Sequence, residues 1–588
     1  MNRLNITLVA LIASVASAIA DRPNILLIMT DDQGYWDTGV TGNPHINTPN
    51  MDRIAREGIQ FTRFYAAPVC APTRAGVMTG RYYPRTGLYN TRFGGDTLGK
   101  NEITVAQLLK KAGYRTGLFG KWHLGKYHGY QPQQRGFDEF LGHYHGHIER
   151  YDFPDQLSHN GVPVKARGYV SELFTDAAID FIEATKKKTK APFFCALTFN
   201  APHSPWVLDT SHFGQPEGDK LLAKYLAKDM PMREARIYSL IERVDQNIGR
   251  MLAHLKTLGI ERETLVIFMS DNGGVSKFWK GGMHGNKGSV YEGGVRSPFF
   301  ARWPGTITAD NVINGQASHV DLLPTFCELA GAPLPKDRKI DGKSLVRLLK
   351  QGHGERHHKY VYHTWDRYFP NPDKRWSVSD QRWKLVGMFT KTAPDPKKWR
   401  LYDLQNDPGE NKDLAAKYPE TVSRLRKAFT DWFIDVTKGK TYRPIAIPVG
   451  HDGENPVELQ PSWATWKGDH INYTFDGYDW DTIDGWKKAG EHAAWQLDVA
   501  QAGRYTLTLS YGCRPLDADG TLRISIGNTS LEHKVQTTTT AEQFGRFPVG
   551  ELVLAKGKAT LKAEVVAAPG RELMRLNGIH LKYIRPSK

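Results

Sequence analysis

The chain has 588 residues, of which 40% are hydrophobic and 24% are charged, and it carries 15 Trp, 25 Tyr and 25 Phe. This content is ordinary for a folded protein and excludes a chain that is disordered throughout. The 78 Lys and Arg against 62 Asp and Glu give a net charge of +16, which favours an anionic partner. Because no nucleic-acid-binding motif occurs, we expect an anionic substrate rather than a nucleic acid.

The first twenty residues have the features of an export signal. Arg3 provides a positive charge, residues 6–12 form a short apolar core, and Ala18-Ile19-Ala20 is a small-x-small cleavage site. The apolar core is too short to span a bilayer, and no later run reaches that length. We therefore expect a signal peptide over 1–20 and a periplasmic or secreted mature protein without a membrane anchor.

Residues 21–350 alternate apolar runs with helical patterns. Continuous apolar runs are typical of strands buried on both faces, and they predict strands at 24–29, 115–119, 192–199 and 264–269. Capping residues and helical periodicity predict helices at 49–57, 105–112, 169–187 and 238–258. This alternation predicts an α/β domain around a large, mostly parallel sheet flanked by helices.

The rest of the chain divides into three parts. Residues 351–435 predict a smaller α+β subdomain, with short strands at 383–386 and 399–404 and an amphipathic helix at 418–433. Four prolines and few apolar runs predict a linker over 436–462. From 463 to 588, alternating patterns at 505–511, 522–526 and 579–583 predict an all-β sandwich.

The C-terminal sandwich is rich in tryptophan. It contains Trp463, Trp466, Trp480, Trp486 and Trp495, and its pattern resembles carbohydrate-binding jelly-roll modules. A structural module that packs on the larger domain is an equally good interpretation, because aromatic side chains of a sandwich belong more often to its core than to a ligand platform.

Side chains with catalytic or metal-binding chemistry directly follow the four expected strands. They are Asp31 and Asp32, then Lys121 and His123, then His203, and finally Asp271 and Asn272. Sites in open α/β sheets lie beyond the carboxyl ends of the strands, so we expect these residues to converge. The carboxylate and amide oxygens favour Ca²⁺, with Mg²⁺ less favoured, over Zn²⁺. The alternative is that Asp-Asp and Asp-Asn-Gly only form turns.

Cys70 differs from the other three cysteines in its surroundings. Four cysteines are too few for a disulfide framework at this length, and no two have metal-ligand spacing. Pro72 and the residues after it predict a helix that begins just after Cys70, and a helix N-terminus attracts anions. A cysteine-dependent phosphatase needs Arg six residues after the cysteine, where this chain has Gly76. The sequence therefore gives little support to a plain thiolate nucleophile.

Six blocks of sequence extend the pattern around Cys70. They are Cys70-Ala71-Pro72-Thr73-Arg74 (C-x-P-x-R) with Thr79-Gly80-Arg81, Gly120-Lys121-Trp122-His123-Leu124-Gly125, Ala201-Pro202-His203-Ser204-Pro205, Ser270-Asp271-Asn272-Gly273, Lys287 with Tyr291-Glu292-Gly293-Gly294-Val295-Arg296, and Leu401-Tyr402-Asp403-Leu404 with Asp407-Pro408 and Glu410-Asn411. With them the chain resembles the type I sulfatases of the alkaline phosphatase superfamily over about residues 22–435. Position 73 is Thr where many members have Ser, and position 71 is Ala. The resemblance implies an alkaline-phosphatase-like fold and hydrolysis of sulfate esters.

The resemblance also implies roles for individual residues. Cys70 would be oxidised to formylglycine by a formylglycine-generating enzyme, join the metal ligands and, as the hydrated aldehyde, attack sulfur to give a covalent sulfo-enzyme intermediate. His203 would protonate the leaving alcohol, and His123 would take the proton that accompanies sulfate release. Lys121 and Lys287 would bind the sulfate oxygens, while Arg74 would orient the modified residue.

Export, basic charge and the C-terminal module favour a sulfated carbohydrate or polysaccharide fragment as the substrate. The candidate substrate contacts are His143, His145 and Arg150 in the His-rich segment 142–151, and His284 near Lys287. A surface loop is the other interpretation of that segment. Two other functions stay open: a formylglycine-dependent phosphodiesterase or phosphonate monoester hydrolase, and a non-catalytic sulfated-glycan-binding protein if Cys70 is not matured.

Overall fold

The computed structural model describes residues 22–152, 154, 156–206, 217–354, 357–388, 399–474, 481–568 and 571–585. The signal peptide expected over 1–20 lies outside these residues. The chain forms two compact units. The large unit comprises the chain up to Tyr89, Leu98–Leu124 and Pro132–Lys440, and the small unit comprises Asn90–Thr97, Gly125–Gln131 and the chain from Thr441. Among the described residues, no helix combines the length and the apolar character that crossing a bilayer needs.

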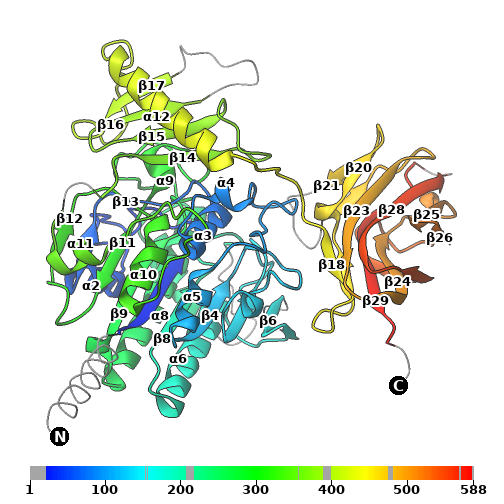
Figure 1. The fold of residues 1–588 in the computed structure, drawn as a ribbon, viewed down its shortest axis with the longest axis horizontal. Coiled ribbons are helices and arrows are strands. Elements are labelled where there is room, and N and C mark those ends of the chain that lie inside the picture. Colours follow the sequence, from blue (N-terminus) through cyan, green and yellow to red (C-terminus); the bar gives the residue numbers. More distant parts are fainter. Residues whose placement is uncertain are drawn as a thin grey trace, which may run out of the picture. The chain divides into compact units, whose positions relative to one another are not determined.

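A sheet with ten strands, counted over the described residues, forms the middle of the large unit (Figure 1). Its order is β12-β2-β11-β9-β1-β8-β4-β5-β6-β7. The central strands run parallel: β9 (Thr264–Ser270), β1 (Asn24–Thr30), β8 (Phe193–Thr198), β4 (Arg115–Lys121) and β5 (Glu139–His143). Antiparallel pairs occur toward the edges, among β2 (Ile59–Phe61), β11 (Phe299–Arg302), β6 (Leu157–His159) and β7 (Val162–Val164), while the edge strand β12 (Asn311–Ile313) is parallel to β2. The predicted parallel sheet is confirmed at its centre.

Alternate residues of β1 point into two separate hydrophobic cores. Ile25 and Leu27 join one core, and Leu26 and Ile28 join the other. The first core is covered by α3 (Cys70–Thr79), α5 (Val105–Lys111), α10 (Leu322–Ala330) and α11 (Val346–Gln351), and the second by α2 (Pro49–Arg56), α6 (Val170–Lys188) and α8 (Met232–Thr257). Burial on both faces explains why the central strands are continuous apolar runs in the sequence.

The expected helices and strands of this domain are present, with one large shift of a boundary. Helix α8 begins at Met232 instead of near Tyr238. Pro231 supplies an extended N-cap and Glu234 an acidic first turn, which suits the positive end of the helix dipole. The large unit also contains the helices α4 (Tyr83–Thr86), α7 (Glu217–Leu226) and α9 (Glu292–Val295).

The α+β subdomain expected over 351–435 is a four-stranded antiparallel sheet with a helix packed on it, and it belongs to the large unit. Its strands are β14 (Val361–Trp365), β15 (Arg375–Ser379), β16 (Trp383–Gly387) and β17 (Trp399–Asp403). Helix α12 (Pro419–Thr437) buries Leu425 and Phe429 against this sheet. A separate three-stranded sheet joins β10 (Arg296–Ser297), β3 (Phe64–Tyr65) and β13 (Ala317–Ser318).

A fully buried ion network connects the subdomain to α9 and β3. Lys384 Nζ on β16 lies 2.9 Å from Glu292 Oε1 and 3.0 Å from Glu410 Oε1. The Glu292 N–H donates to Glu410 Oε2 at 2.7 Å, and Tyr65 Oη donates to Glu292 Oε2 at 3.2 Å. Burial opposes the charge of Lys384, but the two carboxylates outweigh it and raise the pKa of Lys384 above its usual value. The ammonium therefore stays charged inside the protein.

The small unit is a sandwich of two sheets, as predicted for the C-terminal part of the chain. One sheet contains β18 (Ile447–Val449), β20 (Thr465–Lys467), β23 (His492–Val499), β25 (Thr521–Ile526), β26 (Thr529–Lys534) and β28 (Gly557–Ala567). The other contains β19 (Val457–Leu459), β21 (Asn472–Thr474), β22 (Thr482–Asp484), β24 (Gly503–Gly512), β27 (Gly545–Leu554) and β29 (Arg575–Tyr583).

The structure differs from the linker expected over 436–462. Helix α12 continues to Thr437, β18 pairs with β23, and β19 pairs with β29. Each of these two strands has three residues; Pro448 lies within the first and Pro456 precedes the second. Strands this short and this close to proline leave no periodic signal, so the sequence pattern missed them.

The tryptophans of the sandwich differ in burial. Trp463, Trp486 and Trp495 are buried in its core, Trp466 on β20 is 40% exposed, and Trp480 lies outside the described residues. A carbohydrate-binding role for this unit stays a prediction.

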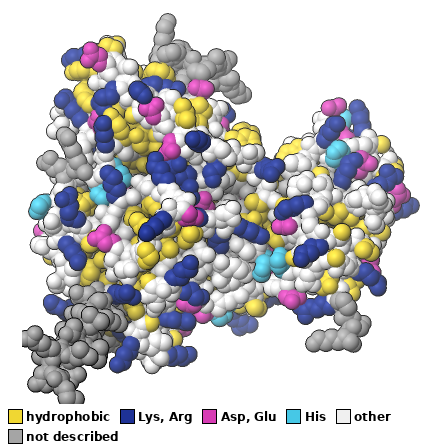
Figure 2. Space-filling model, in the orientation of Figure 1, with side chains coloured by type: hydrophobic (Ala, Val, Ile, Leu, Met, Phe, Trp, Pro, Cys, Tyr) yellow, Lys and Arg dark blue, Asp and Glu magenta, His cyan; other side chains and the backbone are white. Residues whose placement is uncertain are grey.

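On the face drawn in Figure 2, Lys and Arg side chains are scattered among Asp and Glu side chains and do not form one continuous stripe.

Replacing Lys384 with Met should destabilise the large unit strongly. The change leaves Glu292 and Glu410 buried without the ammonium between them, and breaking a buried pair on one side costs about 3–5 kcal/mol. The free energy of unfolding from urea denaturation checks this. The matched control is Lys427→Met, because Lys427 is exposed and pairs with Asp431 one turn away, where we expect a loss of about 0.5 kcal/mol or less. Equal losses in the two variants would contradict the stabilising role of the network.

Candidate active site

The carboxyl ends of β1 and β9 lie side by side because these strands are parallel neighbours. Asp31 and Asp32 follow β1, Asp271 and Asn272 follow β9, and all four side chains are buried. The Asp32 N–H donates to Asp271 Oδ1 at 3.3 Å, and Asn272 Nδ2 donates to Asp32 Oδ1 at 2.9 Å. The structure thus brings together the four residues that the sequence proposed as oxygen ligands.

Cys70 is the first residue of α3, and its thiol belongs to the same cluster. Ligand atoms of Asp31, Cys70 and Asp271 lie within 4.8 Å of one another. The Thr73 hydroxyl accepts the Ala67 N–H at 2.8 Å and so holds the chain that leads into Cys70; a Ser hydroxyl can do the same. Burial raises the pKa of Cys70, so the unmodified thiol is protonated and a poor nucleophile.

Three cations from separate segments neutralise the three carboxylates. Arg74 Nη2 lies 2.8 Å from Asp271 Oδ2, Lys121 Nζ lies 2.5 Å from Asp31 Oδ2, and Lys287 Nζ lies 2.6 Å from Asp32 Oδ1. Burial alone would raise the pKa of Asp31, but Lys121 and the other cations hold it far below its usual value. Burial likewise opposes the charge of Lys287, and Asp32 more than compensates by raising the pKa of Lys287. The Asp31–Lys121 and Asp32–Lys287 pairs are therefore ionised.

Two oxygen atoms of the cluster fit a divalent cation. Asp31 Oδ1 and Asn272 Oδ1 are buried, and neither accepts a hydrogen bond from any residue that the structure describes. Buried acceptors in this state are costly unless something binds them. Burial, followed by the charge of Asp31, raises the pKa of Asp271, and a bound dication would reverse that effect. Hard oxygen donors suit Ca²⁺ or Mg²⁺ better than Zn²⁺.

His203 is held in one orientation by backbone carbonyl contacts. Its Nδ1 donates to Ser204 O at 2.7 Å, and Tyr151 Oη donates to His203 O at 2.6 Å. Its Nε2 lies 3.8 Å from Asp32 Oδ2, so this is the ring atom that faces the cluster. Burial, with a further contribution from Lys287, lowers the pKa of His203, so the ring is neutral near pH 7 with the proton on Nδ1.

The segment around residue 146 contacts both predicted catalytic histidines. His123 is buried with a left-handed φ of 58°, and its ring packs so tightly on Gly146 that a Cβ there would lie 2.5 Å from His123 Cε1. The next residue, His147, lies edge-to-face on His203 with ring centroids 5.5 Å apart. Burial and the neighbouring His203 lower the pKa of His147 to about 3. His147 is a site residue that the sequence pattern did not distinguish from its neighbours.

Residues 23–332, more than half of the chain, match the family model described as Sulfatase. The chain belongs to the sulfatase family. A second model, N-sulphoglucosamine sulphohydrolase, C-terminal, matches residues 282–433.

Three similar proteins agree with this assignment. The chain is 35% identical to rat (Rattus norvegicus) N-acetylgalactosamine-6-sulfatase over 374 residues, which cover 58% of this chain and 68% of the relative. It is 33% identical to human (Homo sapiens) arylsulfatase A over 485 residues, or 71% of this chain and 89% of the relative. The solved structure of Ps i-CgsB in complex with k-i-k-neocarrahexaose superposes with a TM-score of 0.64 at 28% identity and covers 72% of this chain and 95% of that one. The protein is a type I sulfatase of the alkaline phosphatase superfamily, and it hydrolyses sulfuric esters.

The four predicted substrate contacts of this sulfatase differ in access. His143 is fully buried, and its Nε2 lies 2.8 Å from Asn200 Oδ1, so its role as a substrate contact stays a prediction. His145 is half-buried. Arg150 is exposed and donates to Asp152 Oδ2 at 3.1 Å, and His284 is exposed with its ring stacked on Tyr291. These three stay predictions.

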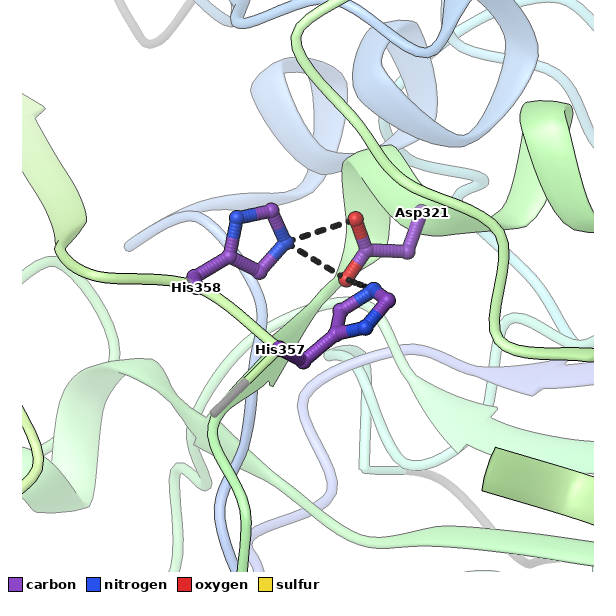
Figure 3. Close-up of side chains that lie close together, drawn as sticks. All are labelled: Asp321, His357 and His358. Carbon is purple, nitrogen blue, oxygen red and sulfur yellow. Dashed lines mark hydrogen bonds and ion pairs between the residues drawn. The ribbon is translucent and has the colours of Figure 1, made fainter. Parts of the chain in front are cut away.

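A second cluster of possible metal ligands contains Asp321, His357 and His358 (Figure 3). His358 Nε2 lies 2.7 Å from Asp321 Oδ1, and His357 Nε2 lies 3.6 Å from Oδ2. The same carboxylate accepts the Ser318 N–H and the Lys343 N–H, each at 2.8 Å. Both oxygens of Asp321 therefore already have donors, unlike the open oxygens of the catalytic cluster. We interpret this second cluster as a support for the start of α10.

Replacing Gly146 with Ala should lower sulfatase activity with little loss of stability. The new methyl group would displace the His123 ring, and a displaced catalytic group costs about tenfold to a hundredfold in rate. Steady-state kinetics with a small aryl sulfate and the melting temperature check both parts. Gly453→Ala in the small unit is the control, because a Cβ there meets only an ordinary contact 3.5 Å away. Full activity of the Gly146 variant would show that His123 needs no fixed position.

Proposed function

We propose that this sulfatase hydrolyses sulfate esters of a sulfated carbohydrate, using Ca²⁺ and a formylglycine made from Cys70. The observation that carries the proposal is the position of Cys70, whose sulfur lies within 4.8 Å of ligand atoms of Asp31 and Asp271, in a cluster with two open buried oxygens. A carbohydrate substrate is supported by the relative named N-acetylgalactosamine-6-sulfatase and by the neocarrahexaose bound to Ps i-CgsB.

The buried oxygens would hold the metal. Asp31, Asp32, Asp271 and Asn272 are its proposed protein ligands, together with the modified residue 70, and the bound ion would supply positive charge for nucleophile activation and sulfate binding. Arg74 keeps Asp271 in place and also donates from Nη1 to the Lys121 backbone oxygen at 2.6 Å.

Two lysines would bind the sulfate oxygens. Lys121 and Lys287 are compact point charges, and both already contact carboxylates of the cluster that contains residue 70. Because Lys121 pairs with Asp31 and Lys287 with Asp32, each would contact a different oxygen of a bound sulfate group. This arrangement favours an ester that carries negative charge.

The two histidines would move protons. His203 Nε2 faces the cluster and is assigned to protonate the leaving sugar oxygen, while His123 is assigned to take the proton that accompanies sulfate release. Because neutral His203 holds its proton on Nδ1, it must gain a second proton at Nε2 before it can act as the acid. A bound anionic ester favours that charged form.

Maturation and export belong to the same proposal. We propose that residues 1–20 direct export to the periplasm or the medium and that a formylglycine-generating enzyme of the host oxidises Cys70. The C-x-P-x-R segment from Cys70 to Arg74 is the proposed recognition element.

The state of residue 70 tests the nucleophile directly. Mass spectrometry of the peptide from the native host should show the mass of an aldehyde in place of the thiol, and Cys70→Ala should lose activity by about 10⁴-fold or more while its melting temperature stays close to that of wild type. An intact thiol in the native-host protein would favour the non-catalytic glycan-binding alternative. Faster turnover of phosphonate or phosphate diesters than of sulfate esters would favour the other alternative.

Removal of the metal should abolish turnover and lower stability. Dialysis against a chelator should reduce activity by about 10²-fold or more, because the site loses the positive charge proposed to activate the nucleophile and bind sulfate. Ca²⁺ should restore activity and the melting temperature better than Mg²⁺ does, since ligand binding to the folded state raises stability. Asp271→Asn should weaken this recovery, and Asp321→Asn in the second cluster is the control that should leave Ca²⁺ recovery unchanged. Restoration by Zn²⁺ alone would contradict the oxygen-ligand assignment.

A further inference from the structure

One segment of the chain, residues 144–151 directly after β5, contacts both histidines of the proposed mechanism. At its start the His123 N–H donates to Tyr144 O at 3.1 Å. At its end Tyr151 Oη donates to His203 O at 2.6 Å. The 144–151 segment therefore connects the two residues that are assigned to move protons.

The 144–151 segment is anchored in the protein interior. Ile148 and Tyr151 are each 1% exposed and belong to the hydrophobic core on the side of the sheet that α6 and α8 cover. Tyr151 O also accepts the Val170 N–H at 2.7 Å, at the start of α6. Because protein cores are closely packed, a side chain carried by such a segment can hold a neighbouring group in place.

His147 is the residue of this segment that lies against the ring of His203. The ring centroids are 5.5 Å apart and the ring planes meet at 66°, which is the edge-to-face arrangement that aromatic rings prefer. Burial and the neighbouring His203 lower the pKa of His147 to about 3. The His147 ring is therefore neutral and does not repel a protonated His203.

The polar contacts of His203 are local or reach only its backbone. Its Nδ1 donates to the oxygen of the next residue, Ser204, and Tyr151 binds its backbone oxygen. Its Nε2, the ring atom that faces the cluster, lies 3.8 Å from Asp32 Oδ2, which is beyond hydrogen-bond distance. The ring of His147 therefore adds a contact to the His203 ring itself, from a buried part of the protein.

We propose that His147 is a positioning residue, which holds the His203 ring so that Nε2 points at the leaving oxygen of the bound ester. A proton donor must lie within about 2.6–3.2 Å of that oxygen, and a displaced donor costs about tenfold to a hundredfold in rate. The cost is largest for a leaving group that departs poorly without a proton. This inference rests on the proposed function, in which His203 is the acid.

Two aryl esters of similar size test this role. The leaving group is good in para-nitrophenyl sulfate and poor in para-methoxyphenyl sulfate. His147→Ala should lower kcat/KM for the methoxyphenyl ester by a factor about tenfold larger than for the nitrophenyl ester. His147→Phe keeps a flat ring and should stay within about threefold of wild type on both esters. His147→Leu fills the space without a ring and should behave like the alanine variant, so a folding defect of one variant leaves the test intact.

A double-mutant cycle separates positioning from any other role of this side chain. In a His203→Ala background, His147→Ala should change the ratio of the two rates by less than about twofold, because the ring that it positions is gone. The ratio does not depend on the amount of folded enzyme. His254→Ala is the control, because His254 lies in the last turn of α8, before the amino end of β9, and this variant should leave the ratio unchanged.

The outcomes separate the inference from the proposed function. Equal losses on both esters in His147→Ala and His147→Leu, or a phenylalanine variant as impaired as these two, would overturn the positioning role. An effect of His147→Ala that persists in the His203→Ala background would overturn it as well. A His203→Ala variant that itself loses the same factor on both esters would show that the acid assignment in the proposed function is wrong, and the inference would fail with it.

Discussion

Neutralisation of three buried carboxylates is the constraint on which the site depends. Asp31, Asp32 and Asp271 lie in one cluster, where burial and mutual repulsion both oppose their charge. Arg74, Lys121 and Lys287 come from three other segments, and each meets one of them. With all three carboxylates ionised the charges of these six side chains would cancel, but burial and the charge of Asp31 raise the pKa of Asp271 to about 7. A bound divalent cation would keep Asp271 ionised and leave an excess of positive charge, which is what an anionic ester and its transition state require.

The rest of the large unit holds these segments in register. Parallel pairing places the ends of β1 and β9 together, and α3 brings Cys70 to them. Beyond Lys287 the chain enters α9, where Glu292 joins the buried network around Lys384. The same network reaches β3, a few residues before Cys70, through the hydroxyl of Tyr65. The subdomain therefore supports both chain segments that carry Cys70 and Lys287, although it contributes none of the six charged residues of the cluster.

The core of the fold and the centre of the site are the parts that the sequence predicts. Strands buried on both faces appear in the sequence as apolar runs, and the polar residues directly after such strands meet at one edge of a parallel sheet. The sequence alone therefore predicts that Asp31 and Asp271 lie close together. His143 and His147 show why the surroundings could not. They share one His-rich segment, yet β5 ends at His143 and buries it, while His147 reaches the ring of His203. Only the position of the strand end distinguishes them, and sequence patterns locate strand ends poorly. For the same reason the sequence did not predict β18 and β19, which have three residues each and lie at or next to prolines.

The division between strand ends and loops also separates chemistry from selectivity. Strand ends are rigid and hold the charged cluster, whereas the 275–286 loop is free to differ in composition and borders that cluster. The ends of the loop are fixed to the site, because the Val275 N–H donates to Asp32 O and the Lys287 N–H donates to Gly274 O. Substitutions in the middle of the loop can therefore change the surroundings of the cluster without moving the carboxylates or the cations that pair with them.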